Sequence, residues 1–162
     1  MTATADTRDI TVEAILPHAP AVIWKVLTTA DLIGQWLMPN DFTAVAGTKF
    51  TFRTTPMGSW DGVVHCEVLE VIENRRLVYS WKGGSDDNPK YGSRLDTVVT
   101  WTLTPVEHGT LLTMVHAGFR LPDNQAAFDG MSPGWSRVLQ RVENVAAQHA
   151  AASPSLPTGP NE

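Results

Sequence analysis

The feature that most constrains the fold of this chain is a change in the spacing of its apolar residues. Through residues 49–119, apolar side chains tend to occupy every second position, which is the pattern of strands with one buried face. Short polar turns separate most of the segments that carry this pattern, so the strands should pair as one antiparallel sheet. The expected strands in this stretch are Lys49–Thr55, Gly62–Glu73, Arg75–Trp81, Asp96–Val106 and Thr110–Phe119.

A strand and two short helices are expected before this stretch. Ile10–Leu16 alternates between apolar and other residues, as a strand does. Pro20 suits the first turn of a helix, where its missing N–H is not needed, and Thr29 can cap a second helix that Pro39 stops. The apolar residues of both helices recur at helical spacing, so each helix should bury one face.

The last expected element is a long helix near the C-terminus. Ser132 suits its N-cap and Pro133 its first position, and the apolar stripe runs to about His149, a length of about 25 Å. Helices and strands are therefore segregated along the chain, which predicts an α+β fold with a curved antiparallel sheet wrapped around the C-terminal helix. One helix does not fill the concave side of such a sheet, so we expect a ligand cavity between the two.

Composition favours one soluble domain that does not bind nucleic acid. The chain has 162 residues, and we expect a domain over residues 9–150 between a flexible N-terminal tail, 1–8, and a disordered C-terminal tail, 151–162. Its net charge of -5 argues against binding to a phosphate backbone. No apolar run reaches the roughly 20 residues of a membrane span, no signal peptide is recognisable, and the single cysteine allows no intrachain disulfide. A cytoplasmic protein is therefore expected.

Several segments resemble the activator of heat-shock-protein ATPase homologue family, within the START-related, Bet v 1-like superfamily. They are Ala19-Pro20 through Trp24, Gly47 through Phe52, Gly62 through Trp81, Thr97 through Pro105, and His116 through Phe119 followed by Gly134-Trp135. The resemblance implies the helix-grip fold. The superfamily includes lipid carriers, hormone receptors, cyclases and a co-chaperone domain, so the resemblance implies no single activity.

Few polar side chains are placed to carry chemistry. His116 shares a strand face with Leu112 and Met114, so we expect it to point inward and to be the polar group that contacts a ligand. His65 and Glu67 share a face of another strand, and because the opposite face is more apolar, this pair should lie on the solvated side. The histidines and the cysteine lack metal-ligand spacing, and no metal or cofactor is expected.

The aromatic residues are the best candidates for the lining of the expected cavity, with core packing as the alternative role for each. Tyr79 and Trp81 share a strand face that should look inward. Trp60 lies in a loop without strand periodicity and is a candidate for the mouth of the cavity. The expected ligand-binding residues are His116, Tyr79, Trp81, Trp60, Phe50, Phe52, Trp135 and Leu139.

These observations favour the binding of a small apolar or aromatic molecule of unknown identity. The alternative is a cavity enzyme of the cyclase, dehydratase or hydrolase type, which needs converging polar groups, and the set available is His116 with Asp96, Tyr79 or Glu67. A third hypothesis is a protein-interaction module associated with a chaperone, as the family's name suggests. The sequence permits a homodimer without requiring one.

Overall fold

The chain folds into a sheet and three helices in the predicted order. The computed structural model describes residues 6–55, 62–83, 95–121 and 124–152. Within these ranges the elements are β1 (Asp6–Leu16), α1 (Pro20–Thr28), α2 (Ala30–Trp36), β2 (Lys49–Arg53), β3 (Val63–Ile72), β4 (Arg76–Gly83), β5 (Leu95–Val106), β6 (Gly109–Leu121) and α3 (Gln125–Ala152).

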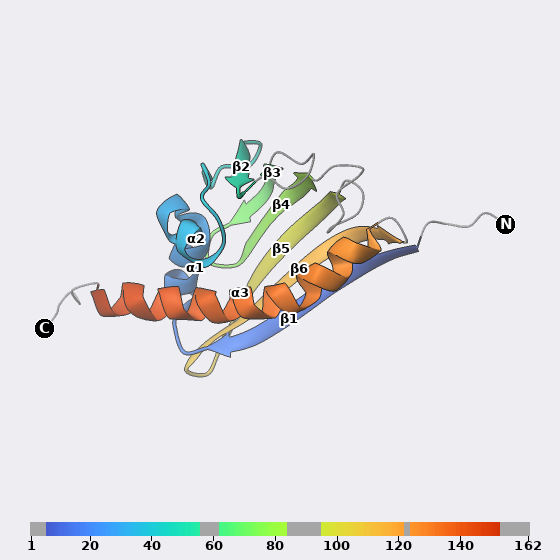
Figure 1. Ribbon diagram of the computed structural model, residues 1–162. Coiled ribbons are helices and arrows are strands. Elements are labelled where there is room, and N and C mark those ends of the chain that lie inside the picture. The colour runs from blue at the N-terminus through green and yellow to red at the C-terminus, as the bar shows by residue number, and fades with distance from the viewer. Residues whose placement is uncertain (1–5, 56–61, 84–94, 122–123, 153–162) are drawn as a thin grey trace, which may run out of the picture.

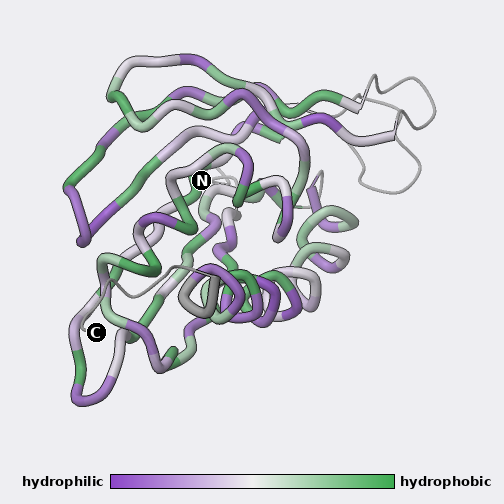
Figure 2. The backbone as a smooth tube through the Cα atoms, turned by 90° about the vertical axis from the view of Figure 1, so that its left-hand side faces the viewer, coloured by the Kyte–Doolittle hydropathy of each residue, from purple (hydrophilic) through white to green (hydrophobic). Residues whose placement is uncertain are grey.

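The six strands form one antiparallel sheet in the spatial order β1-β6-β5-β4-β3-β2. The sheet curves, α3 runs along its concave side, and α1 and α2 lie near one end of α3 (Figure 1). Seen at right angles to that view, the strands arch over α3 (Figure 2). This arrangement confirms the predicted α+β, helix-grip fold, with two short helices after the first strand.

The long C-terminal helix begins earlier than the sequence indicated. A start at Ser132 and Pro133 is wrong, because α3 begins at Gln125 and continues through Pro133 to Ala152. At 1.5 Å per residue its length is about 42 Å rather than about 25 Å. Residues 151 and 152, which were expected in the C-terminal tail, therefore belong to the helix.

Tertiary packing explains the early start of α3. Ala127 is fully buried, and the ring of Phe128 packs edge to face on Phe119 of β6 with 5.7 Å between ring centroids. Pro133 removes one helical N–H, while the hydroxyl of Ser132 donates to the carbonyl oxygen of Phe128 at 2.8 Å instead of capping a new helix. Burial of the first two turns against the sheet offsets the single lost hydrogen bond.

The first strand is also longer than expected. Asp6–Arg8 were expected in the flexible tail, but they pair with Phe119–Leu121 of β6. The guanidinium of Arg8 also lies 5.8 Å from the centre of the Phe128 ring, a cation–π distance. The partner strand and this contact hold a polar segment whose own sequence carries no strand signal.

Candidate functional site

Four aromatic residues that were expected to line a cavity lie together on the concave face of the sheet. Phe50 and Phe52 come from β2, and Tyr79 and Trp81 from β4. The ring centroids of Phe50 and Phe52, of Phe50 and Tyr79, and of Phe52 and Trp81 are each 5.3 Å apart. Each residue is at most 4% exposed, so these rings themselves fill this part of the concave side.

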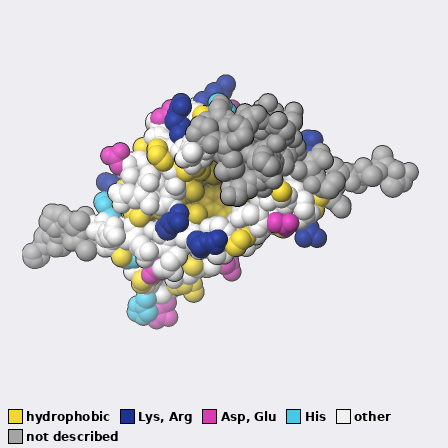
Figure 3. Space-filling view, viewed as in Figure 1, with side chains coloured by type: hydrophobic (Ala, Val, Ile, Leu, Met, Phe, Trp, Pro, Cys, Tyr) yellow, Lys and Arg dark blue, Asp and Glu magenta, His cyan; other side chains and the backbone are white. Residues whose placement is uncertain are grey.

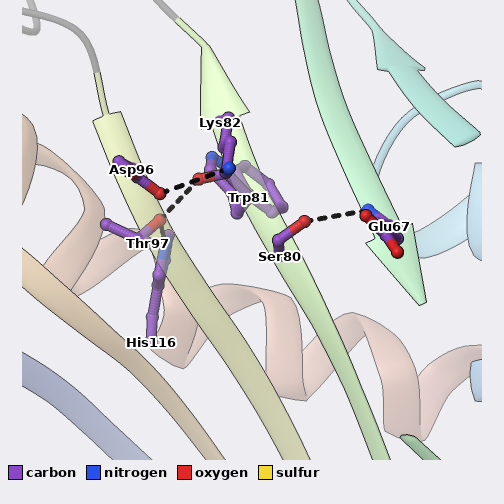
Figure 4. A network of polar contacts seen from close by, with 7 residues as sticks. All are labelled: Glu67, Ser80, Trp81, Lys82, Asp96, Thr97 and His116. Atoms are coloured by element: carbon purple, nitrogen blue, oxygen red, sulfur yellow. Dashed lines mark hydrogen bonds and ion pairs between the residues drawn. The ribbon is translucent and has the colours of Figure 1, made fainter. Parts of the chain in front are cut away.

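His116 lies in the middle of a chain of buried hydrogen bonds. Its Nδ1 lies 3.0 Å from the indole nitrogen of Trp135, and its Nε2 lies 2.7 Å from the hydroxyl oxygen of Thr97. An indole N–H can only donate, so Nδ1 accepts and we assign the ring proton to Nε2. The Nε2–H then donates to Thr97, whose hydroxyl donates to the carbonyl oxygen of Trp81 at 2.8 Å (Figure 4).

The environment of His116 keeps its imidazole neutral, and these hydrogen bonds leave neither of its ring nitrogens free. Burial lowers its pKa to about 3. Protonation of Nδ1 would also place a second donor against the indole N–H of Trp135. The arrangement therefore suits a side chain that joins β5, β6 and α3 and orients Trp135, rather than a base that exchanges protons near neutral pH.

The polar groups considered for catalysis do not converge. Tyr79 faces inward, and its hydroxyl accepts the indole N–H of Trp101 at 3.0 Å, while burial raises the pKa of that hydroxyl. Asp96 lies on the other face, with 70% of its side chain exposed, 3.8 Å from the ammonium of Lys82 (Figure 4). Glu67 alternates with buried neighbours on β3 and also faces outward, as does His65, which is exposed as predicted.

An open pocket lies where α3 passes the end of α2 and strand β4. Its volume is about 240 Å³. In the view of Figure 3 a yellow, hydrophobic hollow is visible with dark blue Lys and Arg side chains along one rim. The lining of this α2–α3 pocket consists of Leu37, Met38, Trp81, Gly130, Met131, Gly134, Trp135, Arg137, Val138 and Arg141.

Local hydrogen bonds hold the wall of the pocket that follows α2. The amide nitrogen of Asn40 donates to the carbonyl oxygens of Ala30 at 3.1 Å and Met38 at 2.9 Å. The amide oxygen of Asn40 accepts the backbone N–H of Phe42 at 3.0 Å. The backbone N–H of Leu37 donates to Ile33 at 2.8 Å and closes the last turn of α2. This wall is therefore anchored to the helix before it.

The opposite wall belongs to the middle of α3, where two glycines leave room. Gly130 and Gly134 are four residues apart, so they lie on the same side of the helix. A Cβ placed on Gly134 would have no other group within 4 Å. The absence of a side chain at Gly134 therefore keeps this part of the pocket open.

Two arginines that the sequence analysis did not single out form the charged part of the lining. Arg137 and Arg141 are exposed and one turn apart on α3. Neither makes a hydrogen bond or an ion pair with the residues that the structure describes. The available signal was their position beside the apolar stripe of α3, in a chain whose net charge is negative. The stripe itself did not indicate which side of the helix would border a pocket.

The structure separates the expected ligand-binding residues into groups. Trp81 and Trp135 line the α2–α3 pocket, and His116 lies behind them. Phe50, Phe52 and Tyr79, which share the buried cluster described above with Trp81, do not line the pocket. Leu139 borders a smaller hollow of about 120 Å³ between β1 and α3. Trp60 lies outside the described residues.

Metal and membrane sites receive no support from the described part of the chain. No group of three or more His, Cys, Asp or Glu side chains in it is arranged to hold a metal ion. No helix among the described residues is both long and apolar enough to cross a bilayer. Cys66 is buried, and this burial raises the pKa of its thiol, so it behaves as a small apolar residue.

Comparisons with known proteins agree with the fold. The family described as Activator of Hsp90 ATPase homolog 1-like protein matches residues 17–147. No curated protein matches the chain. The crystal structure of protein MLL2253 from Mesorhizobium loti is 38% identical, with coverage of 87% of this chain and 98% of that one and a TM-score of 0.76.

More distant structures share the fold alone. Protein BH1534 from Bacillus halodurans is 23% identical, with coverage of 88% of this chain and 99% of that one and a TM-score of 0.70. The Aha1 dimer from Colwellia psychrerythraea is 18% identical, with coverage of 86% of this chain and 96% of that one and a TM-score of 0.67.

Proposed function

The chain belongs to the Activator of Hsp90 ATPase homolog 1-like family, and we propose that it binds a small, largely apolar molecule in the α2–α3 pocket. Small hydrophobic ligands are common among members of this family. The observation that carries the proposal is an apolar hollow with two indole rings in its wall, Trp81 and Trp135. Ligand sites are typically apolar and aromatic, with a few polar groups at defined positions.

The dimensions of the pocket support a small ligand. Its volume of about 240 Å³ lies just below the range of about 300–1,000 Å³ that is usual for ligand sites. The pocket is open to solvent, so part of a bound molecule would remain exposed. Its walls are preformed. Asn40 anchors the side that follows α2, and the hydrogen bond from the indole N–H of Trp135 to His116 anchors the side on α3. A preformed site loses little entropy on binding.

The polar groups in and near the pocket favour binding of a ligand without a chemical reaction. An enzyme acting here needs a proton-transfer pair or a nucleophile with its base beside the ligand. The charged side chains of the lining are Arg137 and Arg141, and a guanidinium group offers N–H donors but no acceptor for a proton. His116 is enclosed behind the two tryptophans with both nitrogens engaged. These observations support a carrier or sensor of a small molecule.

The proposal is tested by titrating the protein with naphthalene-1-acetamide, an uncharged aromatic probe, and following the indole N–H signals by ¹⁵N NMR. We expect the signals of Trp81 and Trp135 to shift and those of Trp36 and Trp101, which do not line the pocket, to shift least. Gly134→Leu should abolish these shifts, because its side chain would occupy open space in the pocket.

Gly34→Leu is the matched control. Gly34 is a helical glycine of α2 with equally open space around it and no place in the lining. This variant should bind the probe as the unchanged protein does. The proposal is wrong if the probe leaves the Trp81 and Trp135 signals in place, or if Gly134→Leu and Gly34→Leu bind it equally well.

A further inference from the structure

The α2–α3 pocket combines an apolar floor with charge of one sign. Its charged side chains are Arg137 and Arg141, and no carboxylate lines it among the described residues. The chain as a whole carries a formal net charge of -5. Two adjacent cations at an apolar hollow are therefore a local exception to the overall charge, and like charges one turn apart cost some helix stability.

The arginines are also available to a ligand. Arg76, by contrast, is engaged by Glu70 at 3.1 Å. Arg137 and Arg141 have no such partner among the described residues. Their guanidinium groups offer planar pairs of N–H donors, which match the two oxygens of a carboxylate or of a phosphate ester.

We propose that the ligand of this pocket is an amphipathic organic anion, whose apolar body lies against Trp81 and Trp135 and whose carboxylate or phosphate group binds Arg137 and Arg141. This inference rests on the proposed function and adds the chemical class of the ligand. The apolar part supplies burial and the anion sets the orientation, since both arginines of the lining come from α3 and lie one turn apart.

A pair of isosteric probes tests the charge. Naphthalene-1-acetate and naphthalene-1-acetamide have the same shape and number of heavy atoms, and they differ in one negative charge. The Kd of each is measured from the Trp81 and Trp135 indole signals by ¹⁵N NMR. In the unchanged protein the acetate should bind about 5- to 10-fold more tightly than the acetamide, the effect of two exposed charge-assisted contacts.

The double variant Arg137→Gln/Arg141→Gln should remove this preference. The Kd of the acetate should rise about 5- to 10-fold, and that of the acetamide should stay within about twofold, because the apolar walls are unchanged. Both positions are exposed helix positions where glutamine is a good helix former, so the fold should persist. The control Lys25→Gln/Arg75→Gln removes the same amount of charge at exposed positions outside the lining and should leave both affinities unchanged.

The outcomes separate this inference from the proposed function. Equal binding of acetate and acetamide, unaffected by Arg137→Gln/Arg141→Gln but abolished by Gly134→Leu, would overturn the anion inference and leave the pocket as a ligand site. An equal loss of acetate affinity in the Lys25→Gln/Arg75→Gln control would also overturn it, because the effect would then come from net charge. If neither probe moves the Trp81 and Trp135 signals, both proposals fail.

The head group is distinguished by a third probe, 1-naphthyl phosphate, in the same titration. Tighter binding of the phosphate than of the acetate assigns a phosphate ester as the preferred anion, and the reverse order assigns a carboxylate. In either case Arg137→Gln/Arg141→Gln should weaken the better anion more than the acetamide, and the inference is wrong if it does not.

Discussion

The buried hydrogen bonds around His116 and the α2–α3 pocket lie on opposite sides of Trp81 and Trp135, and their polar groups differ in whether they have partners in the protein. Behind Trp81 and Trp135, the nitrogens of His116 and the hydroxyl of Thr97 are engaged by other protein groups. In front of the same two indoles, Arg137 and Arg141 face the pocket without partners among the described residues. Satisfied buried groups specify the fold, whereas exposed charged groups beside an apolar hollow are available to a ligand.

The largest effect that this comparison predicts is the loss of stability when the buried hydrogen bonds around His116 are removed. His116→Ala removes a fully buried ring, leaves a cavity, and removes the partner of the Trp135 indole N–H and one of the two partners of the Thr97 hydroxyl. We expect a loss of about 3–5 kcal/mol in the free energy of unfolding, measured by urea denaturation. The exposed His65→Ala on β3 should change it by less than about 0.5 kcal/mol. Similar losses in the two variants would refute the distinction between interior and surface.

Acid should lower the free energy of unfolding through the buried imidazole of His116. The pKa of His116 falls from 6.5 in the unfolded chain to about 3 in the folded protein because of burial. Between these values the unfolded chain binds a proton that the folded protein does not, so stability falls as the pH drops through this window. From about pH 7 to about pH 5 this contribution should cost about 2 kcal/mol.

The test is urea denaturation at both pH values for the protein and for His116→Gln. The glutamine amide supplies a donor and an acceptor in place of the two ring nitrogens but does not titrate. The loss of stability on acidification should be about 2 kcal/mol smaller in His116→Gln. An identical loss in both proteins would contradict the buried, neutral state of His116.

A smaller and more specific effect is expected at Thr97. Thr97→Val keeps the size of the side chain but leaves the Nε2–H of His116 and the carbonyl oxygen of Trp81 without their partner. The expected cost is about 2 kcal/mol, and Thr97→Ser should recover most of it by restoring the hydroxyl. Thr104→Val on the same strand is exposed and serves as the control. Thermal unfolding of the three variants decides whether the hydroxyl or the shape matters.

The smallest effect is expected in the pocket, and its sign is opposite. Gly134→Ala places a methyl group in open space on a helix, so it should stabilise the protein by up to about 1 kcal/mol. The same variant should weaken binding of a naphthalene probe, because it narrows the hollow. Gly34→Ala in α2 should give comparable stabilisation with unchanged binding. A destabilising Gly134→Ala would show that this wall is packed rather than open.

The sheet was predictable because alternation is a local signal. The strands β2 to β6 match the expected segments within a few residues, and Phe50, Tyr79 and His116 face inward as the alternation required. The start of α3 was not predictable in this way. Ser132 and Pro133 carry a sound local signal for a helix start, but burial of Ala127 and Phe128 against β6 outweighs it.

The candidate site was predictable only in part. Strand alternation indicates that Trp81 is turned inward. It does not distinguish an inward residue in the core from one that borders a pocket, because both occupy every second position of the strand. Trp81, Trp135, Phe50 and Tyr79 all belong to the buried core, but the two tryptophans also border the hollow, whereas Phe50 and Tyr79 do not. Arg137 and Arg141 carried no motif, and their role depends on how α2 and β4 approach α3.

The sequence by itself determined the order of helices and strands, the antiparallel sheet and the face that each strand buries, because periodicity acts between neighbours along the chain. Tertiary structure alone decided the length of α3, the partners of His116 and the position of the pocket. Those features depend on contacts between segments far apart in sequence, such as Trp81 on β4 with Trp135 on α3. Such contacts form only when the sheet has curved around the helix, so no local pattern records them.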